Sequence, residues 1–274
     1  MKPILFLLQI IYPLLLQCLL ASTPVQADEA REKNWSLGVG VGSLYGPDYR
    51  GSNEYRAYTA PIPYVVYHGK FIRSDRDGVR AHFFSSDTLD FSLSATAFIV
   101  PDADKNTKRE GMPELGSTLE LGPSLNIRLT GNDLQQGWNF RLPWRGVYAI
   151  GGANNEYVGS VLQPQLVYKN RVEHWSFAYR ASLLFSSNRY HDYYYRVAPQ
   201  YVSANRAYYE AHGGYSGWSS EISLSRSLTI SQIDTRLAFY IRYDNLSNTD
   251  FISSPLVETD HSLRGGLALI WVIQ

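Results

Sequence analysis

Long runs of strict alternation between apolar and polar residues constrain this chain more than any other feature of its sequence. From Leu89 to Ile99 every second residue is apolar, and the same period of two recurs in 117–129 and 174–186. Successive side chains of a β-strand point to opposite faces of the sheet, so this period is typical of strands with one apolar face. The 21 Tyr and 21 Gly of the chain also favour strands and turns over helices. We therefore expect an all-β fold.

The alternating segments predict twelve antiparallel strands. They are residues 35–43, 56–67, 70–75, 78–84, 88–99, 117–129, 137–149, 159–168, 174–186, 214–226, 234–244 and 262–273. Short links (68–69, 85–88, 130–134, 169–173, 227–233) alternate with long ones (44–55, 100–116, 150–158, 187–213, 245–261). Such alternation is typical of barrel hairpins, and it puts both termini at the end with the short links. Residues 70–84 also fit a single bulged strand, and a further strand would then be needed within 187–213.

Two architectures fit these strands: a soluble sandwich or lipocalin-like barrel with the apolar face inward, or an outer-membrane barrel with that face against lipid. The strands are about 10–13 residues long, whereas strands of globular proteins have roughly 5–6. Aromatic residues such as Trp144, Trp175 and Phe185 lie at the ends of apolar stripes, as interfacial girdles require. The opposite face carries Arg, Asn and Glu in mid-strand, which suits a wet lumen. We predict a transmembrane antiparallel β-barrel surrounded by outer-membrane lipid, with the soluble barrel as the alternative.

The N-terminus has the pattern of a secretory signal peptide. Lys2 precedes an apolar run from Ile4 to Leu20, and Val25-Gln26-Ala27 carries the small residues that a signal peptidase reads. We expect residues 1–27 to be removed and 28–274 to form the barrel. The alternative, a transmembrane anchor, fits less well because the run is short and contains Pro13. No later stretch approaches the ~20 apolar residues of a membrane helix.

Composition excludes several classes of function. The only cysteine, Cys18, lies in the signal peptide, so the mature chain has no disulfide, thiolate metal site or cysteine nucleophile. The chain has 25 basic and 25 acidic residues, which argues against a nucleic-acid partner.

Several segments resemble the MltA-interacting protein (MipA/OmpV) family of outer-membrane proteins of Gram-negative bacteria. The similar segments are Gly38–Gly42, Gly46–Ser52, Pro61–Tyr64, Asp75–Gly78, Gly111–Leu115, Leu119–Pro123, Tyr193–Val197 and Ser253–Val257. They span almost the whole mature chain in order. One departure is the C-terminus: such barrels usually end on an aromatic residue, whereas this chain continues three residues beyond Trp271.

The resemblance implies a location in the outer membrane and a scaffold role that links a murein transglycosylase to a murein synthase. Other members of the family are surface antigens or adhesins. The resemblance implies no active site.

The residues themselves also argue against catalysis and against a bound cofactor or metal. The glycines at 38, 40 and 42 lie within a predicted strand and lack the spacing of a dinucleotide-binding loop. No two of the six histidines have the spacing of helical metal ligands. Asp260, His261 and Ser262 are adjacent on a strand, so we expect their side chains to diverge rather than form a hydrolase triad. We predict a protein that is not an enzyme, with no cofactor and no metal.

Alternation places a set of charged residues on the inner face of the predicted barrel. The candidate lumen-lining residues are Arg80, Glu120, Arg128, Arg141, Arg145, Arg180, Glu221, Arg236, Arg242 and Arg264, together with Asp90 and Asp244. Arginine exceeds the carboxylates there. The set fits either an internal salt-bridge network that fills a narrow barrel, or a narrow channel or binding lumen for small anionic solutes such as acidic sugars or small carboxylates.

Two long links carry the remaining features. Residues 100–116 contain both signs of charge, including Lys105, Lys108 and Arg109, and we expect them to be solvated. Residues 187–213 are rich in tyrosine. The candidate surface contacts are Tyr190, Tyr193, Tyr194, Tyr195, Tyr208 and Tyr209. They fit either an adhesive patch or a segment that packs into the barrel mouth.

Overall fold

The computed structural model describes residues 35–67, 72–75, 78–86, 88–98, 105–230 and 232–273. The predicted signal peptide, residues 1–27, lies outside the described residues. Residues Trp35–Gln274 form one compact unit that is mostly β-structure. Among the described residues, no helix is both long and apolar enough to cross a membrane.

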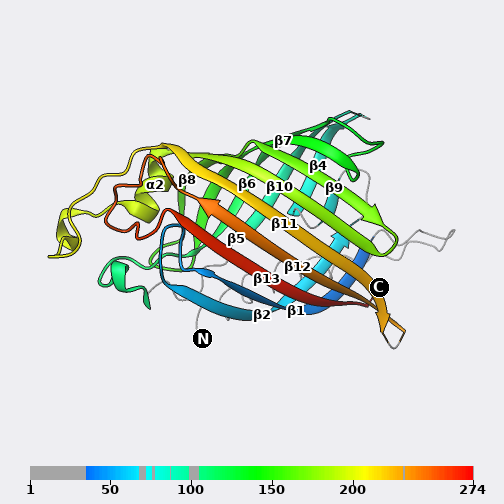
Figure 1. The fold of residues 1–274 in the computed structure, drawn as a ribbon, viewed down its shortest axis with the longest axis horizontal. Helices are drawn as coiled ribbons and strands as arrows, with labels where there is room; N and C mark the ends of the chain where they lie inside the picture. The colour runs from blue at the N-terminus through cyan, green and yellow to red at the C-terminus, as the bar shows by residue number, and fades with distance from the viewer. Residues whose placement is uncertain are drawn as a thin grey trace, which may run out of the picture. The chain divides into compact units, whose positions relative to one another are not determined.

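A single antiparallel sheet of thirteen strands makes up this unit (Figure 1). The strands are β1 (Trp35–Pro47), β2 (Tyr55–Tyr67), β3 (Ile72–Asp75), β4 (Gly78–Ser85), β5 (Leu89–Phe98), β6 (Ser117–Arg128), β7 (Gly137–Ile150), β8 (Glu156–Leu162), β9 (Gln165–Val172), β10 (Trp175–Ser186), β11 (Gly214–Ile230), β12 (Ile233–Asn245) and β13 (His261–Val272). Their order is β2-β1-β13-β12-β11-β10-β8-β7-β6-β5-β4-β3, and β9 pairs with β7 and β10.

The strand count corrects the prediction of twelve. The segment predicted as one strand at 159–168 is divided into β8 and β9, which share one position between β7 and β10. Pro164 lies at the division and has no N–H to donate to a strand ladder. Residues 72–85 form two strands, β3 and β4, and residues 187–213 contain helix α2 (Asn188–Tyr195) rather than a further strand.

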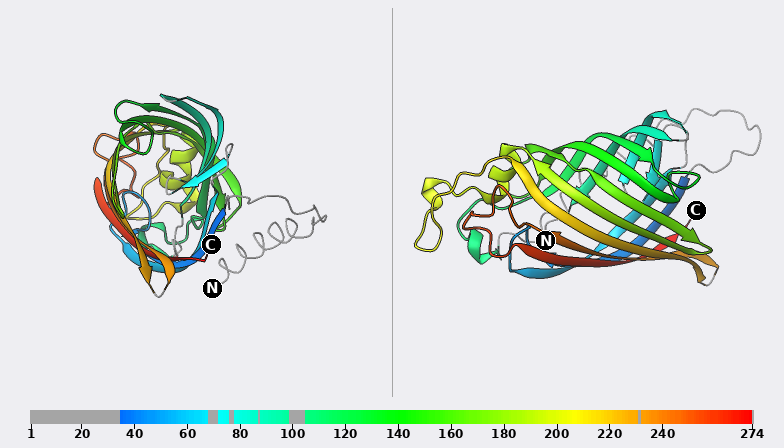
Figure 2. Two further views of the ribbon diagram at one scale, coloured as in Figure 1. Left: turned by 90° about the vertical axis from the view of Figure 1, so that its right-hand side faces the viewer. Right: turned by 45° about the horizontal axis from the view of Figure 1, so that its top comes forward.

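The sheet curls around an interior, and the view along its axis in Figure 2 shows α2 inside the curve of the strands. The two strands at the ends of the pairing order, β2 and β3, lie next to each other, with Cα atoms within 8 Å. The longer links lie at one end of the sheet, here called the loop end, together with α2 and the short helices η2 (Thr107–Arg109) and η3 (Pro199–Tyr201) (Figure 1). The β11–β12 hairpin and the end of β13 lie at the opposite, turn end.

Burial is inverted relative to a soluble protein. Large apolar side chains on the strands are exposed, with Trp144 at 58% and neighbours such as Leu237 and Leu267 also open to solvent. Polar side chains on the opposite face are buried, with Asp244 at 0% and Asn139 equally inaccessible. The alternation of the sequence therefore directs polar groups inward and apolar groups outward.

Candidate functional site: an arginine-rich interior cavity

A belt of buried polar residues runs across the inner face of the sheet. Each member lies directly opposite the next in the strand register, from β5 to β13. The belt consists of Asp90, Asn126, Arg141, Gln165, Ser182, Ser219, Asp244 and Ser262. Asn126 donates from Nδ2 to Asp90 Oδ1 at 2.9 Å. Strand pairing therefore gathers, at one level of the interior, polar groups that are far apart in the sequence.

Asp244 is the most highly connected carboxylate of this interior. Its oxygens lie 2.9 Å from Arg242 Nη2, 3.3 Å from Arg50 Nε and 3.4 Å from Arg264 Nε. Arg242 and Arg264 are directly opposite each other on β12 and β13, an arrangement that like charges disfavour. Asp244, two residues along β12, offsets this repulsion because it contacts both guanidinium groups.

Two further carboxylates extend the network around the sheet. Glu221 on β11 accepts from Arg180 Nη1 at 2.6 Å and lies 3.9 Å from Arg242. Glu120 on β6 lies 3.1 Å from Arg145 Nε, and Arg145 also donates to Gln163 Oε1 at 2.7 Å. The ion pairs thus join β6 to β7, and join β10, β11, β12 and β13 to one another, on the inner face.

These charged groups surround a cavity of about 280 Å³. Among the described residues, the charged side chains that line it are Arg50, Arg141, Arg145, Arg180, Arg242, Arg264, Asp48, Glu120 and Glu221. Ser94, Thr96, Thr118, Asn126, Gln163 and Gln165 add neutral hydrogen-bonding groups. The cavity is therefore strongly polar, with arginine as its main component.

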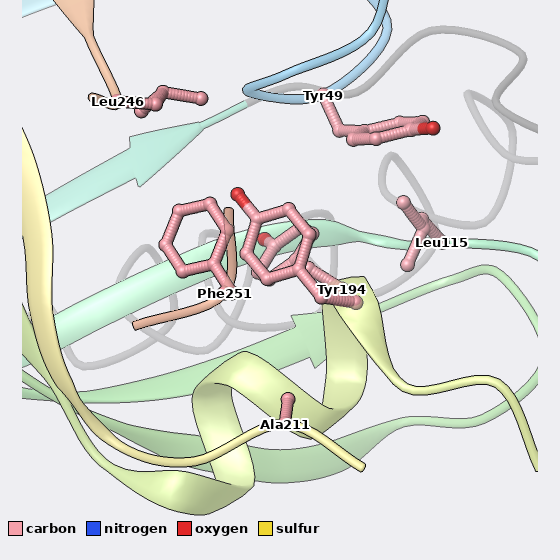
Figure 3. Close-up of a cluster of buried hydrophobic side chains, with 7 residues drawn as sticks. Tyr49, Leu115, Tyr194, Ala211, Leu246 and Phe251 are labelled. Carbon is pink, nitrogen blue, oxygen red and sulfur yellow. The ribbon is translucent and has the colours of Figure 1, made fainter. Parts of the chain in front are cut away.

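Helix α2 closes the loop end of this cavity with aromatic rings. Its Tyr190, Tyr194 and Tyr195 line the cavity, and Tyr195 stacks on Phe251 with ring centroids 3.7 Å apart. Figure 3 shows Tyr194 and Phe251 in one cluster with residues from the other loops; its buried members are Tyr49, Leu115, Tyr194, Tyr195, Ala211, Leu246 and Phe251. We call this the loop-end cluster. Burial raises the pKa of Tyr190 to about 12, so its ring remains neutral.

The loop-end cluster favours one of the two alternatives for the tyrosine-rich segment, packing into the barrel mouth over an exposed adhesive patch. Tyr194 and Tyr195 are buried, Tyr190, Tyr193 and Tyr209 are partly buried and pack against the cluster, and Tyr208 alone of the six is exposed. The cause is α2: Ser187 caps its N-terminus, accepting from Tyr190 N, and the helix then turns its rings toward the interior. The alternative of packing into the mouth describes these residues better.

The prediction that residues 100–116 are solvated requires correction. Residues 99–104 lie outside the described residues, but Asn106 and Arg109 are buried. Asn106 donates from Nδ2 to Asp48 Oδ2 at 2.9 Å and to Ser52 Oγ at 3.0 Å. Arg109 donates to the carbonyls of Tyr194 and Pro113. These contacts tie the β5–β6 link to the β1–β2 link and to α2.

Seven of the ten candidate lumen residues line the cavity: Glu120, Arg141, Arg145, Arg180, Glu221, Arg242 and Arg264. Of the other three, Arg128 and Arg236 do not line it. Arg128 lies at the end of β6 and donates to the carbonyl of Asn132 in the adjacent turn, and Arg236 lies on β12 toward the turn end. The side chain of Arg80 lies outside the described residues, although its backbone pairs with Ser94.

Sequence reasoning missed the contribution of the loops to this site. Arg50 and Tyr49 lie in the β1–β2 link, outside any alternating segment, yet both line the cavity. The hydroxyl of Tyr49 donates to the carbonyl of Leu256 at 2.7 Å, a residue 207 positions away. Both residues belong to the Gly46–Ser52 segment on which the family resemblance partly depends. That resemblance does not indicate whether either side chain points into the interior.

The histidines show two close polar contacts. His261 Nδ1 lies 2.8 Å from Asp260 Oδ1, so the expectation that these neighbours diverge is wrong for this pair; Ser262 is buried on the inner face instead. Buried His191 donates from Nδ1 to the carbonyl of His212, and its Nε2 lies 2.6 Å from Ser216 Oγ. The part of the chain that the structure describes contains no cluster of three or more potential metal ligands.

Comparison with protein-family models identifies the family of the chain. A protein-family model described as MltA-interacting protein MipA matches residues 39–273, which include every described strand in whole or in large part. No curated protein matches the chain.

Proposed function

Since the chain belongs to the MltA-interacting protein MipA family, we propose that it is a non-catalytic β-barrel of the Gram-negative outer membrane that acts as an interaction scaffold. The observation that carries this proposal is the inverted burial of the strands. Exposed apolar residues such as Leu237, Phe239 and Leu267 would leave a large area of apolar surface in water if the protein were soluble. Lipid removes that cost, while the polar interior retains its partners.

The arrangement of links supports one orientation in the membrane. Outer-membrane barrels have short periplasmic turns and longer extracellular loops. On this basis the loop end, with α2, faces outward, and the turn end faces the periplasm, where murein and its enzymes are located.

The family description supports a murein transglycosylase as the partner, and a murein synthase would be the second protein of the scaffold. The β11–β12 hairpin offers a contact surface at the turn end. β11 is the longest strand, with 17 residues, and Ile230 and Ile233 pair at its tip with 50% and 45% exposure. An exposed apolar tip is a common feature of protein contact sites.

Location and partner are testable separately. We expect the protein to remain in the outer-membrane fraction after carbonate washing and to need detergent for solubility; recovery as a soluble monomer would refute the barrel.

In detergent, we expect the protein to capture a purified murein transglycosylase. Replacing Ile230 and Ile233 with Asp should weaken capture at least tenfold, whereas Ile252→Asp, an exposed isoleucine at the loop end, should not. Equal capture by both variants would exclude the hairpin.

A channel for small anionic solutes is the second candidate, and the arginine lining of the cavity favours it. The tyrosine rings of α2 at the loop end argue against a continuous path. Planar-bilayer recordings separate the two: a channel gives anion-selective steps that fall in Arg141→Glu or Arg180→Glu, whereas a scaffold gives none. An adhesin role has less support, because of the six candidate contact tyrosines only Tyr208 is exposed.

A further inference from the structure

Positive charge exceeds negative charge in the wall of the interior cavity. Six arginines and three carboxylates line it among the described residues. Asp244 and Asp90 are buried beside the wall and add two further carboxylates, which leaves an excess of one positive charge among the described residues. Asp48, one of the three, is already 2.8 Å from Arg56, an arginine outside the lining.

The carboxylates of the wall have little capacity left for these arginines. Asp244 pairs with three guanidinium groups, Glu221 pairs with two and Glu120 pairs with one. Arg50 depends on the shared Asp244, and its Nη2 is buried without a hydrogen-bond partner among the described residues. Concentrated positive charge in a confined, poorly screened space favours an added anion.

Two arginine side chains of the wall keep about a fifth of their surface exposed. Arg180 and Arg242 retain 20% and 22% of their side-chain surface, and both line the cavity. Guanidinium groups bind carboxylate and phosphate oxygens with two parallel hydrogen bonds, and a cavity of about 280 Å³ has room for a small molecule that carries such groups. The tyrosines of α2 line the cavity toward the loop end.

We propose that this cavity binds a small oxyanion with two or more negative charges, a polycarboxylate or a phosphate, held chiefly by Arg145, Arg180 and Arg242. The binding is independent of the scaffold function, which uses the turn end of the molecule.

The test uses the full mature chain, folded in an uncharged detergent, with citrate, inorganic phosphate and glucose as probes in isothermal titration calorimetry. We expect citrate or phosphate to bind, with an affinity that falls as salt rises, and glucose not to bind. The better of the two anions identifies the ligand class. Equal binding of glucose, or no binding of either anion, would overturn the proposal.

Two variants that each remove one charge should change the affinity in opposite directions. Arg180→Gln removes one positive charge and should weaken binding about tenfold, whereas Glu221→Gln removes the carboxylate that competes for Arg180 and Arg242 and should strengthen it. Arg189→Gln is the control, because Arg189 pairs with Glu156 on the outer surface and should leave the affinity unchanged.

General damage to the fold would weaken binding in both variants, so the opposite signs distinguish a site from misfolding. If Arg180→Gln does not fold, as judged by circular dichroism, Glu221→Gln decides alone: tighter binding supports the site, and unchanged or weaker binding overturns it. Capture of the transglycosylase by the same variants should equal that of the parent protein. Loss of anion binding and loss of the scaffold function therefore remain distinguishable.

Discussion

The two halves of the interior bury different kinds of side chain. Near the loop end, Tyr195, Phe251 and Leu246 pack into an apolar cluster. Near the end of β12, Asp244 is just as inaccessible but is surrounded by arginines. Each apolar side chain in the cluster contributes through its own burial, so losses there are local and moderate. In the charged network each group depends on its partners, so loss of one carboxylate leaves several buried charges uncompensated.

The largest effect is expected at Asp244. Asp244→Asn keeps the shape of the side chain but removes the charge that offsets Arg50, Arg242 and Arg264. We expect the free energy of unfolding to fall by about 3–5 kcal/mol, the usual cost of breaking a buried ion pair from one side. Urea unfolding in detergent measures it. Ser262→Ala is the control, because Ser262 lies opposite Asp244 and its hydroxyl has no hydrogen-bond partner among the described residues. Similar losses in both variants would show that packing, not charge, stabilises this level.

A moderate effect is expected in the loop-end cluster. Phe251→Leu removes the ring that stacks on Tyr195 but leaves an apolar side chain, so we expect a loss of about 1–1.5 kcal/mol. Tyr208→Leu changes an exposed ring and should stay within about 0.5 kcal/mol of the parent. Near-ultraviolet circular dichroism should lose tyrosine signal in the first variant only. A loss above about 3 kcal/mol for Phe251→Leu would contradict the distinction between the two halves.

The two halves also differ in how far the sequence predicts them. Alternation placed Arg141, Arg180 and Arg242 on the inner face because the direction of a strand side chain depends only on its position parity. Burial of Asn106, Arg109 and Tyr49 depends on contacts between links separated by at least 50 residues, such as Asn106 with Asp48, and no local pattern records these. The sequence analysis does not predict helix α2, because its tyrosines are not typical helix formers. Ser187, a residue type that often caps helix N-termini, is the one local indication of this helix. Pro164 likewise indicates a break between two strands, and the prediction of twelve strands does not take it into account.

The smallest effect, and the most selective for the loop end, is expected from pH. His191 lies on α2 between the carbonyl of His212 and Ser216, and burial holds its pKa below the ordinary value of 6.5. The His212 carbonyl and the carboxylates of Asp250 and Asp192 act in the opposite direction, and Arg50 adds to the lowering; burial has the largest influence.

Because the folded state keeps His191 neutral, the unfolded chain binds more protons below pH 6.5. Stability contributed by this residue is therefore complete above that pH and declines as pH falls toward the lowered pKa, by at most about 1.4 kcal/mol per pH unit. We expect the tyrosine signal of the loop-end cluster to become easier to melt between pH 7 and pH 5. His191→Gln should abolish that dependence, whereas His174→Gln, an exposed histidine at the turn end, should retain it. An unchanged slope in His191→Gln would assign the acid sensitivity to the carboxylates of the charged network, and the loop end would no longer be the half of the interior that responds to mild acid.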